Sequence, residues 1–306
     1  MSHIEEQIDR LRRSPKPFEL VVGIGGGSVL DVAKLLAALL PQKTLSIEDL
    51  LAGKATFEKE PLPFVAIPTT AGTGSEVTLY ASLEDHRRMK VSAEHRFLFP
   101  RVALIDPLLT HSMDPYLTAV TGFDALSHAI EALWSRRHNP FSDTHAFKAV
   151  QLIGQNLEKA VRSPQDAPAR AAMAWGSCEA GLAISHTRTT AVHAVSYPLT
   201  TRFGIVHGHS CALTLASFIL YNESVLTLLQ IQALKQALGV SSIAEASETI
   251  QRLMEAVRLE RRLSALGLKR EDLAVVVSDA LQADRMRNNP REVDGKALSN
   301  MLEQIY

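Results

Sequence analysis

Hydrophobic and polar positions in the first third of the chain alternate between strand-like and helix-like runs. Residues 4–12 have the spacing of a short amphipathic helix, and the apolar, β-rich run at 18–24 has the length of a buried strand. Helical periodicity follows at 29–40, and two further apolar runs at 62–68 and 101–107 predict more strands. Because helices are expected between these strands, the pattern predicts a parallel α/β sheet.

After residue 110 the spacing becomes helical almost throughout. Asp114 is a favourable N-cap, and Pro115 suits the first position of a helix. The predicted helices are 115–136, 140–162, 166–185, 212–237, 243–256, 272–284 and 296–304. We therefore expect an α/β domain at residues 1–109 and an all-α helical-bundle domain at residues 110–306.

Composition narrows the class of protein but not its chemistry. The formal net charge is −1 and no basic patch stands out, which argues against a nucleic acid partner. No run approaches the roughly 18 unbroken apolar residues of a membrane span, and residues 1–17 lack the apolar core of a signal peptide. Cys178 and Cys211 have no CxxC partner and are interpreted as small buried hydrophobes. A cytoplasmic protein with no membrane partner is expected.

Three glycines and a serine at residues 25–28 separate the first predicted strand from the helix that follows it. Glycine lets a ligand approach the backbone closely, and the free N–H groups at a helix start attract an anion such as a phosphate. The standard dinucleotide fingerprint is nevertheless absent, because the nearest downstream acidic residues, Glu48 and Asp49, lie in a polar helical stretch. The glycine turn alone is therefore a weak signal.

A second polar loop follows the strand predicted at 62–68 and contains Thr69, Thr70, Thr73 and Ser75. Ligands of open α/β sheets bind at the carboxyl ends of the strands, so both loops are expected to face one crevice. The alternative is a turn whose hydroxyl groups bond only to their own backbone.

Asp124 and His128 are spaced to share one face of a helix, among residues that are otherwise apolar. His193 lies on a predicted helix that Pro198 is expected to end, and His207 opens another apolar helix. One carboxylate and three imidazoles suit Fe(II) or Zn(II), and four protein ligands favour the ion with the higher coordination number, Fe(II). The alternative is a set of polar residues that face solvent, and spacing alone leaves the metal open.

Several motifs in register resemble the iron-containing (group III) alcohol dehydrogenases, relatives of glycerol dehydrogenase and dehydroquinate synthase. They are GGGSVLDVAK, IPTTAGTGSEVT, LIDPLLT, GFDALSHAIEA and the pair VH…VHG, in the order of the family. The resemblance implies a dehydroquinate synthase-like fold, with part of a Rossmann-like dinucleotide-binding domain at 1–109 and a metal-binding helical domain at 110–306. It further implies hydride transfer between NAD(H) or NADP(H) and a small aldehyde or primary alcohol, Fe(2+) or Zn(2+) as the metal, and a homo-oligomer.

The resemblance also implies roles for individual residues. The metal ligands would be Asp124, His128, His193 and His207. The cofactor contacts would be Gly25, Gly26, Gly27, Ser28, Asp31, Thr69, Thr70, Lys90 and Leu109, with Thr73 and Ser75 from the same polar loop. Tyr197 stands where many members have a histidine linked to proton relay, and a phenol can also donate a proton.

The region around the last two metal ligands is similar to members that are phosphonoacetaldehyde reductases. Arg188, Arg202 and His209 flank those ligands, and the arginine fork matches the oxygens of a phosphonate. A phosphonate-bearing aldehyde is therefore one expected substrate. The alternative is that both arginines pair with surface carboxylates.

The chain also departs from the pattern of the family. A segment worth roughly two βα units, which would precede the glycine turn, is represented only by its last helix. That segment would carry the acidic residue that senses the adenosine ribose, so NAD and NADP are not distinguished. Two alternatives stay open: a truncated non-catalytic remnant or partner-dependent fragment, and a metal-dependent lyase or cyclase of the dehydroquinate synthase type.

Overall fold

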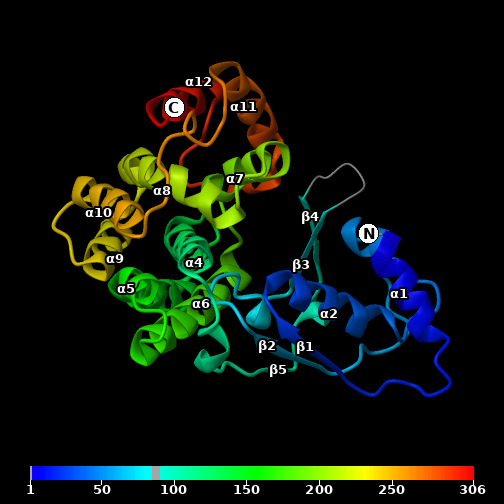
Figure 1. Ribbon diagram of the computed structural model, residues 1–306. Helices are drawn as coiled ribbons and strands as arrows, with labels where there is room; N and C mark the ends of the chain where they lie inside the picture. Colours follow the sequence, from blue (N-terminus) through cyan, green and yellow to red (C-terminus); the bar gives the residue numbers. More distant parts are fainter. Residues whose placement is uncertain (1, 85–89) are drawn as a thin grey trace.

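The structure, a computed structural model, describes residues 2–84 and 90–306, which form an α/β part followed by a helical part (Figure 1). The α/β part contains a parallel sheet with the strand order β1-β2-β5. Its strands are β1 (Val21–Gly25), β2 (Phe64–Pro68) and β5 (Val102–Ala103), and its helices are α1 (Ser2–Arg12), α2 (Gly27–Leu39) and α3 (Ile47–Leu51). This arrangement confirms the predicted class of fold.

Helix α2 covers one face of the sheet. Leu30, Ala33 and Ala37 pack against Phe64 and Ala66. In the register of the sheet, Gly23 pairs with Ala66, and a Cβ on Gly23 would lie 2.9 Å from the Cβ of Ala33. Glycine at this position therefore lets the helix approach the strand closely.

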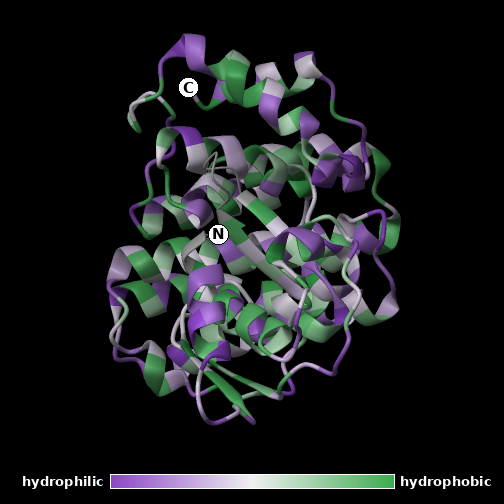
Figure 2. Ribbon diagram, turned by 90° about the vertical axis from the view of Figure 1, so that its right-hand side faces the viewer, coloured by the Kyte–Doolittle hydropathy of each residue, from purple (hydrophilic) through white to green (hydrophobic). Residues whose placement is uncertain are grey.

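The opposite face of the sheet remains uncovered in the described chain. We call it the open face, and it consists of Val22, Ile24, Val102 and Leu104, whose side chains are between 47% and 59% exposed. Val22 and Val102 flank Val65 in the same row of the sheet, and the strands carry the hydrophobic colour at the lower edge of Figure 2. Parallel sheets are ordinarily covered on both faces, so this apolar surface is unusual.

The connection from β2 to β5 differs from the prediction. A helix was expected there, but the chain forms an antiparallel hairpin of β3 (Tyr80–Glu84) and β4 (Lys90–Glu94), with one 3₁₀ turn before it (Ser75–Val77) and one after it (Arg96–Leu98). The hairpin side chains alternate with the period of a strand, and the hydroxyls of Ser82 and Ser92 hydrogen-bond across it at 2.8 Å. That short pattern was missed because it lacks an apolar run.

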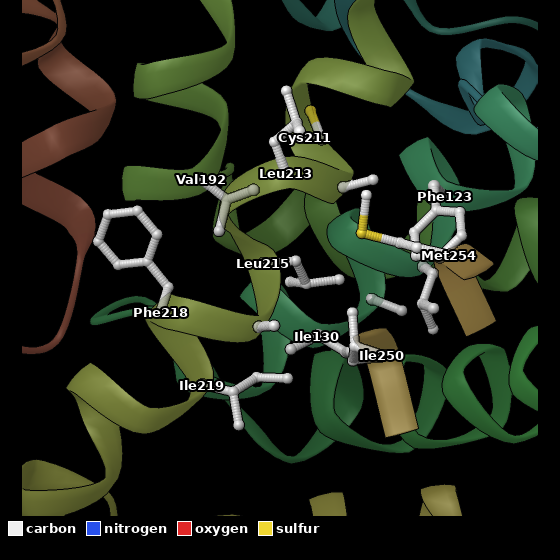
Figure 3. Close-up of a cluster of buried hydrophobic side chains, with 14 of the residues drawn as sticks. Phe123, Ile130, Val192, Cys211, Leu213, Leu215, Phe218, Ile219, Ile250 and Met254 are labelled. Atoms are coloured by element: carbon white, nitrogen blue, oxygen red, sulfur yellow. The ribbon is translucent and has the colours of Figure 1, made fainter. Parts of the chain in front are cut away.

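The helical part starts as predicted. The Asp114 side chain accepts a hydrogen bond from the Leu117 N–H at 2.7 Å, and Pro115 occupies the first turn. The helices are α4 (Pro115–Trp134), α5 (Pro140–Arg162), α6 (Ala167–Thr187), α7 (Ala191–Phe203), α8 (His207–Asn222), α9 (Leu228–Leu238), α10 (Ile243–Ala256), α11 (Leu273–Gln282) and α12 (Gly295–Gln304). In the core that they share, Ile130 of α4, Leu215 of α8 and Ile250 of α10 lie close together (Figure 3).

Two helix boundaries correct the predictions. The single helix expected at 212–237 is two helices, because Thr227 and Gln230 form a capping box that starts α9. Pro198 does not end α7, which continues to Phe203 and stops at Gly204 in the left-handed conformation. Proline removes only its own N–H donor, and burial of the flanking turns holds the helix together around it. No helix in the described part of the chain is long and apolar enough to cross a membrane.

Candidate metal and cofactor site

Helices α4, α7 and α8 bring one carboxylate and three imidazoles together. The Oδ1 atom of Asp124 lies 3.7 Å from Nε2 of His128, 3.4 Å from Nε2 of His193 and 3.6 Å from Nε2 of His207. The rings of His128 and His193 stack with centroids 4.5 Å apart. All four side chains predicted as metal ligands therefore converge, although their role as ligands stays a prediction.

The separations between Asp124 and the three histidines fit a metal ion. Tetrahedral ligands about 2.1 Å from a metal are about 3.4 Å from one another, close to these three separations. Asp124 Oδ1 and His193 Nε2 are buried and have no hydrogen-bond partner among the described residues. Buried polar atoms without a partner are costly, and a cation between them would satisfy both.

Cys211 also faces this site. Its Sγ atom and the ligand atoms of Asp124, His193 and His207 all lie within 4.8 Å of one another. The interpretation as a buried residue is confirmed, since Cys211 is fully buried, but a thiol beside three metal-ligand candidates is more than a small hydrophobe. Burial raises the pKa of this thiol, and the His193 imidazole opposes that rise.

The electrostatics of the four residues favour an anionic carboxylate. Burial by itself would raise the pKa of Asp124, but the imidazoles of His128, His207 and His193 outweigh it and hold that pKa far below its usual range. Burial would lower the pKa of His193, but Cys211, Glu131 and Asp124 raise it well above its usual value. Metal ligation needs a neutral imidazole, so a metal and a proton compete for His193.

Glu131 supports His193 and was missed by the sequence reasoning. The Glu131 carboxylate is fully buried and contacts His193 Nδ1, and it accepts hydrogen bonds from the N–H of Thr190 at 2.8 Å and from its hydroxyl at 2.6 Å. A carboxylate at Nδ1 fixes the ring so that Nε2 points toward Asp124, as in other metal sites. Glu131 lies seven residues after Asp124 and so on the same face of the helix, and this spacing is the sequence signal that would have revealed its role.

Replacing Glu131 with glutamine is expected to weaken metal binding about 10- to 100-fold. The charge that orients His193 and favours its N–H at Nδ1 would be lost, while the volume of the side chain would be kept. Titration of the metal-loaded protein with a competing chelator measures this affinity. The matched control is Glu179→Gln, which removes a similar carboxylate from His145 outside the cleft, at 2.5 Å. An unchanged metal affinity in Glu131→Gln would contradict the positioning role.

Both predicted loops face the same cleft as the four metal-ligand candidates. The cleft has a volume of about 1340 Å³. The predicted site residues that line it are Gly26, Gly27, Ser28, Asp31, Thr70, Thr73, Ser75, Asp124, His128, Arg188, His193, Tyr197 and His207. A Cβ on Gly27 would lie 2.6 Å from Cγ2 of Thr73, so glycine is required where the loops meet.

Asp31 joins the two loops to the β3–β4 hairpin. Its Oδ1 atom accepts a hydrogen bond from the Ser75 hydroxyl at 2.6 Å, and its Oδ2 atom accepts one from the Ser82 N–H at 2.9 Å. The Ser75 N–H also donates a hydrogen bond to the Thr73 hydroxyl at 3.2 Å. Part of the second loop therefore forms hydrogen bonds within the loop, as the alternative interpretation supposed. These contacts hold the loop backbones in place beside the cleft.

Three of the predicted cofactor contacts, Gly25, Thr69 and Leu109, are not found in the described lining of the cleft. The Thr69 N–H donates to the Gly25 carbonyl at 3.0 Å, so both residues tie the ends of β1 and β2 together. Leu109 lies in a 3₁₀ turn (Pro107–Thr110) away from the lining. Lys90 begins β4, but its side chain lies outside the described residues.

Tyr197 and Arg188 both line the cleft. Tyr197 lies one helical turn after His193, and its ring centroid is 6.0 Å from that of His207. Arg188 has the backbone angle φ 58°, which is rare for a side-chain-bearing residue, and its guanidinium pairs with the carboxylate of Glu94.

Arg202 and His209 do not reach the lining of the cleft. The Nε–H group of Arg202 donates to Asp279 at 2.5 Å, which is the surface pairing that the alternative interpretation described. His209 is buried with Nε2 at 2.7 Å from the Glu260 carbonyl and Nδ1 at 3.4 Å from the Tyr116 hydroxyl. Because both nitrogens of His209 are engaged elsewhere, the geometry gives no support to its predicted contact with substrate.

Arg285 lines the cleft and was not predicted. It lies in a 3₁₀ turn after α11 (Asp284–Asn288), and its guanidinium carbon is 4.8 Å from the ring centroid of Tyr197. Nothing in the local sequence marks Arg285 as part of a site.

Comparison with known proteins agrees with this geometry. Residues 1–107 match the family described as iron-containing alcohol dehydrogenase, and residues 118–306 match the C-terminal domain of the Fe-containing alcohol dehydrogenase family. The chain is 41% identical over 278 residues to long-chain-alcohol dehydrogenase 1 of Geobacillus thermodenitrificans, covering 88% of this chain and 70% of the relative. It is 33% identical to phosphonoacetaldehyde reductase of Streptomyces viridochromogenes, covering 93% and 75%.

Among solved structures, sulfoacetaldehyde reductase from Bifidobacterium kashiwanohense in complex with NAD+ superposes with a TM-score of 0.92 at 34% identity, covering 99% of this chain and 80% of the other. Both domains of one family thus match in order along the chain. The chain therefore belongs to the iron-containing alcohol dehydrogenase family, and the protein is an NAD-dependent oxidoreductase of alcohols and aldehydes.

Proposed function

We propose that the enzyme reduces a short aldehyde that carries an anionic group, in the first place phosphonoacetaldehyde, to the corresponding alcohol. The observation that carries the proposal is the convergence of Asp124, His128, His193 and His207 at one cleft, with separations that suit a metal ion. We assign these four residues to iron.

Bound there, iron would supply Lewis acidity toward a carbonyl oxygen, and the nicotinamide would supply the hydride. Asp124 offsets part of the charge of the metal, and Glu131 holds His193 in the orientation that ligation needs. The glycine turn at the start of α2 and the loop around Thr73 take the phosphates of the cofactor. Tyr197, one helical turn from His193, delivers a proton from its hydroxyl to the oxygen of the reduced substrate.

Two relatives support an anionic substrate, since their names specify phosphonoacetaldehyde and sulfoacetaldehyde. The lining of the cleft supports it as well, because the guanidinium of Arg285 lies over the Tyr197 ring and bonds to the Ser92 hydroxyl. The relative from Geobacillus is named for long-chain alcohols. An alkyl chain beside these groups would bury them without a polar partner, and that burial is unfavourable.

The test is the activity of the iron-loaded enzyme, followed by NADH absorbance. Phosphonoacetaldehyde, sulfoacetaldehyde, propionaldehyde and a long-chain aldehyde are compared at matched concentrations. We expect kcat/KM to be at least about 10-fold higher for the anionic aldehydes, the gain from one charge-assisted hydrogen bond. A preference for the long-chain aldehyde, or no turnover of any aldehyde, would overturn the proposed substrate class.

A further inference from the structure

We infer that Arg285 recognises the anionic group of the substrate and determines the specificity of the enzyme for short anionic aldehydes. The inference rests on the proposed function. Arg285 is half-buried in the cleft, and its guanidinium carbon lies 4.8 Å from the Tyr197 ring centroid, which is itself 6.0 Å from the centroid of His207. The positive charge of Arg285 is thus linked to the metal-ligand candidates through two contacts, the first with the Tyr197 ring and the second between the rings of Tyr197 and His207.

The guanidinium of Arg285 retains most of its hydrogen-bonding capacity. Of its five N–H donors, one Nη2–H bonds to the Ser92 hydroxyl, at 3.3 Å. Among the side chains that the structure describes, no carboxylate pairs with Arg285. The guanidinium carbon lies over the Tyr197 ring, and a cation held against an aromatic ring in this way can still donate hydrogen bonds to the oxygens of a phosphonate or sulfonate.

Neighbouring acidic groups do not neutralise this charge, because each is paired with a different arginine. Glu94 pairs with Arg188, Asp279 with Arg202, and Asp284 with Arg287 at 3.8 Å. The arginines that the sequence singled out are therefore the ones already engaged. Three arginines are found in the described lining of the cleft: Arg188 is paired with Glu94, Arg96 is exposed and lies over the Phe97 ring, and Arg285 is the half-buried one that has no carboxylate pair among the described side chains.

The position of Arg285 also limits the size of the ligand. The carbonyl end of the substrate would lie at the four metal-ligand candidates, and the anionic end would lie past one tyrosine ring, a separation suited to a carbon chain of a few atoms. Phosphonate and sulfonate oxygens have the geometry that an arginine fork binds in a bidentate manner. The structure thus points to short aldehydes with a terminal tetrahedral anion.

The experiment uses the iron-loaded full chain with the substitutions Arg285→Gln and Arg285→Lys, and Arg291→Gln as the matched control. Arg291 also lies over a tyrosine ring, with its guanidinium carbon 4.0 Å from the Tyr221 centroid, but it does not line the cleft. Steady-state kinetics are measured with phosphonoacetaldehyde, sulfoacetaldehyde and propionaldehyde. For Arg285→Gln we expect KM for both anionic aldehydes to rise roughly 10- to 100-fold, while kcat/KM for propionaldehyde changes less than about 3-fold.

Arg285→Lys should recover part of the affinity, because it restores the charge but not the fork, and Arg291→Gln should behave as the unsubstituted enzyme. If Arg285→Gln does not fold, the same comparison of anionic with uncharged substrate in Arg285→Lys decides the question. An equal loss on all three aldehydes would show a merely structural contact with Ser92 and overturn the inference. The inference would also be overturned if Arg285→Gln left KM for the anionic aldehydes unchanged while the unsubstituted enzyme prefers them. In that case the proposed function would still stand. An enzyme with no preference for anionic aldehydes would overturn both.

Discussion

Replacing Asp124 with alanine is expected to abolish stoichiometric iron binding and to lower kcat/KM for aldehyde reduction by roughly 1000-fold or more, the scale of losing Lewis-acid catalysis. The Oδ1 atom of Asp124 lies 3.4 to 3.7 Å from the Nε2 atoms of all three histidines. Removing it would leave a buried set of neutral donors with no carboxylate to offset a divalent cation, which makes burial of the ion unfavourable. Metal analysis of the desalted protein and NADH-linked turnover measure the two effects.

The control for Asp124→Ala is Asp143→Ala. Asp143 lies on α5 and pairs with His138 at 3.0 Å, outside the cleft, and exposed pairs contribute little to stability. Far-UV circular dichroism establishes that both variants are folded, and Asp124→Asn offers a second variant of nearly unchanged volume. Retention of iron at the original stoichiometry in Asp124→Ala would refute the assignment of this residue as a ligand.

Replacing Gly208 with alanine is expected to lower the free energy of unfolding by about 3 kcal/mol or more, because the added methyl group has no room. A Cβ at this position would lie 1.8 Å from the backbone oxygen of Val120 and 3.1 Å from Cβ of Asp124. Helix α8 would have to move away from α4, and His207 would move with it. The Asp124–His207 separation of 3.6 Å therefore depends on the absence of a side chain at the next residue.

Urea unfolding of the metal-free and metal-loaded forms measures the effect of Gly208→Ala. Gly154→Ala is the matched control, because the nearest atom to its new Cβ would be 3.6 Å away, an ordinary contact, in the middle of α5. That substitution should be neutral or stabilising by up to about 1 kcal/mol, as alanine favours helix over glycine. Equal stability of the two variants would show that α4 and α8 can separate without cost.

Patterns that extend over a few residues were sufficient to predict the elements whose structure is determined by neighbouring residues in the sequence. The strand, glycine turn and helix around residues 25–28, the helix start at Asp114 and the shared helix face of Asp124 and His128 follow from local spacing, and the structure confirms them. His193 and His207 were grouped with that pair as further histidines on helices downstream, and the order of the motifs then implied that all four are ligands, since no spacing rule connects residues on three different helices.

Contacts between distant segments could not be predicted from such patterns. Arg285 meets Tyr197 and Ser92 only because the turn after α11 folds back over the hairpin, and an arginine has no periodic signal. Arg202 and His209 flank the metal-ligand candidates in sequence, but their directions depend on helix packing, which turns them toward Asp279 and Glu260. Proline disfavours the interior of a helix, but Pro198 lies inside α7 because tertiary burial outweighs that local preference.

The open face of the sheet has a practical consequence for anyone handling the chain. Fluorescent probes that brighten in apolar surroundings bind exposed hydrocarbon, and Val22, Ile24, Val102 and Leu104 offer it in the native state. Bright emission before heating would thus be a property of the ordered strands, and it should not be taken as loss of side-chain packing. Melting is better followed through the indole of Trp134, which is enclosed in the helical core.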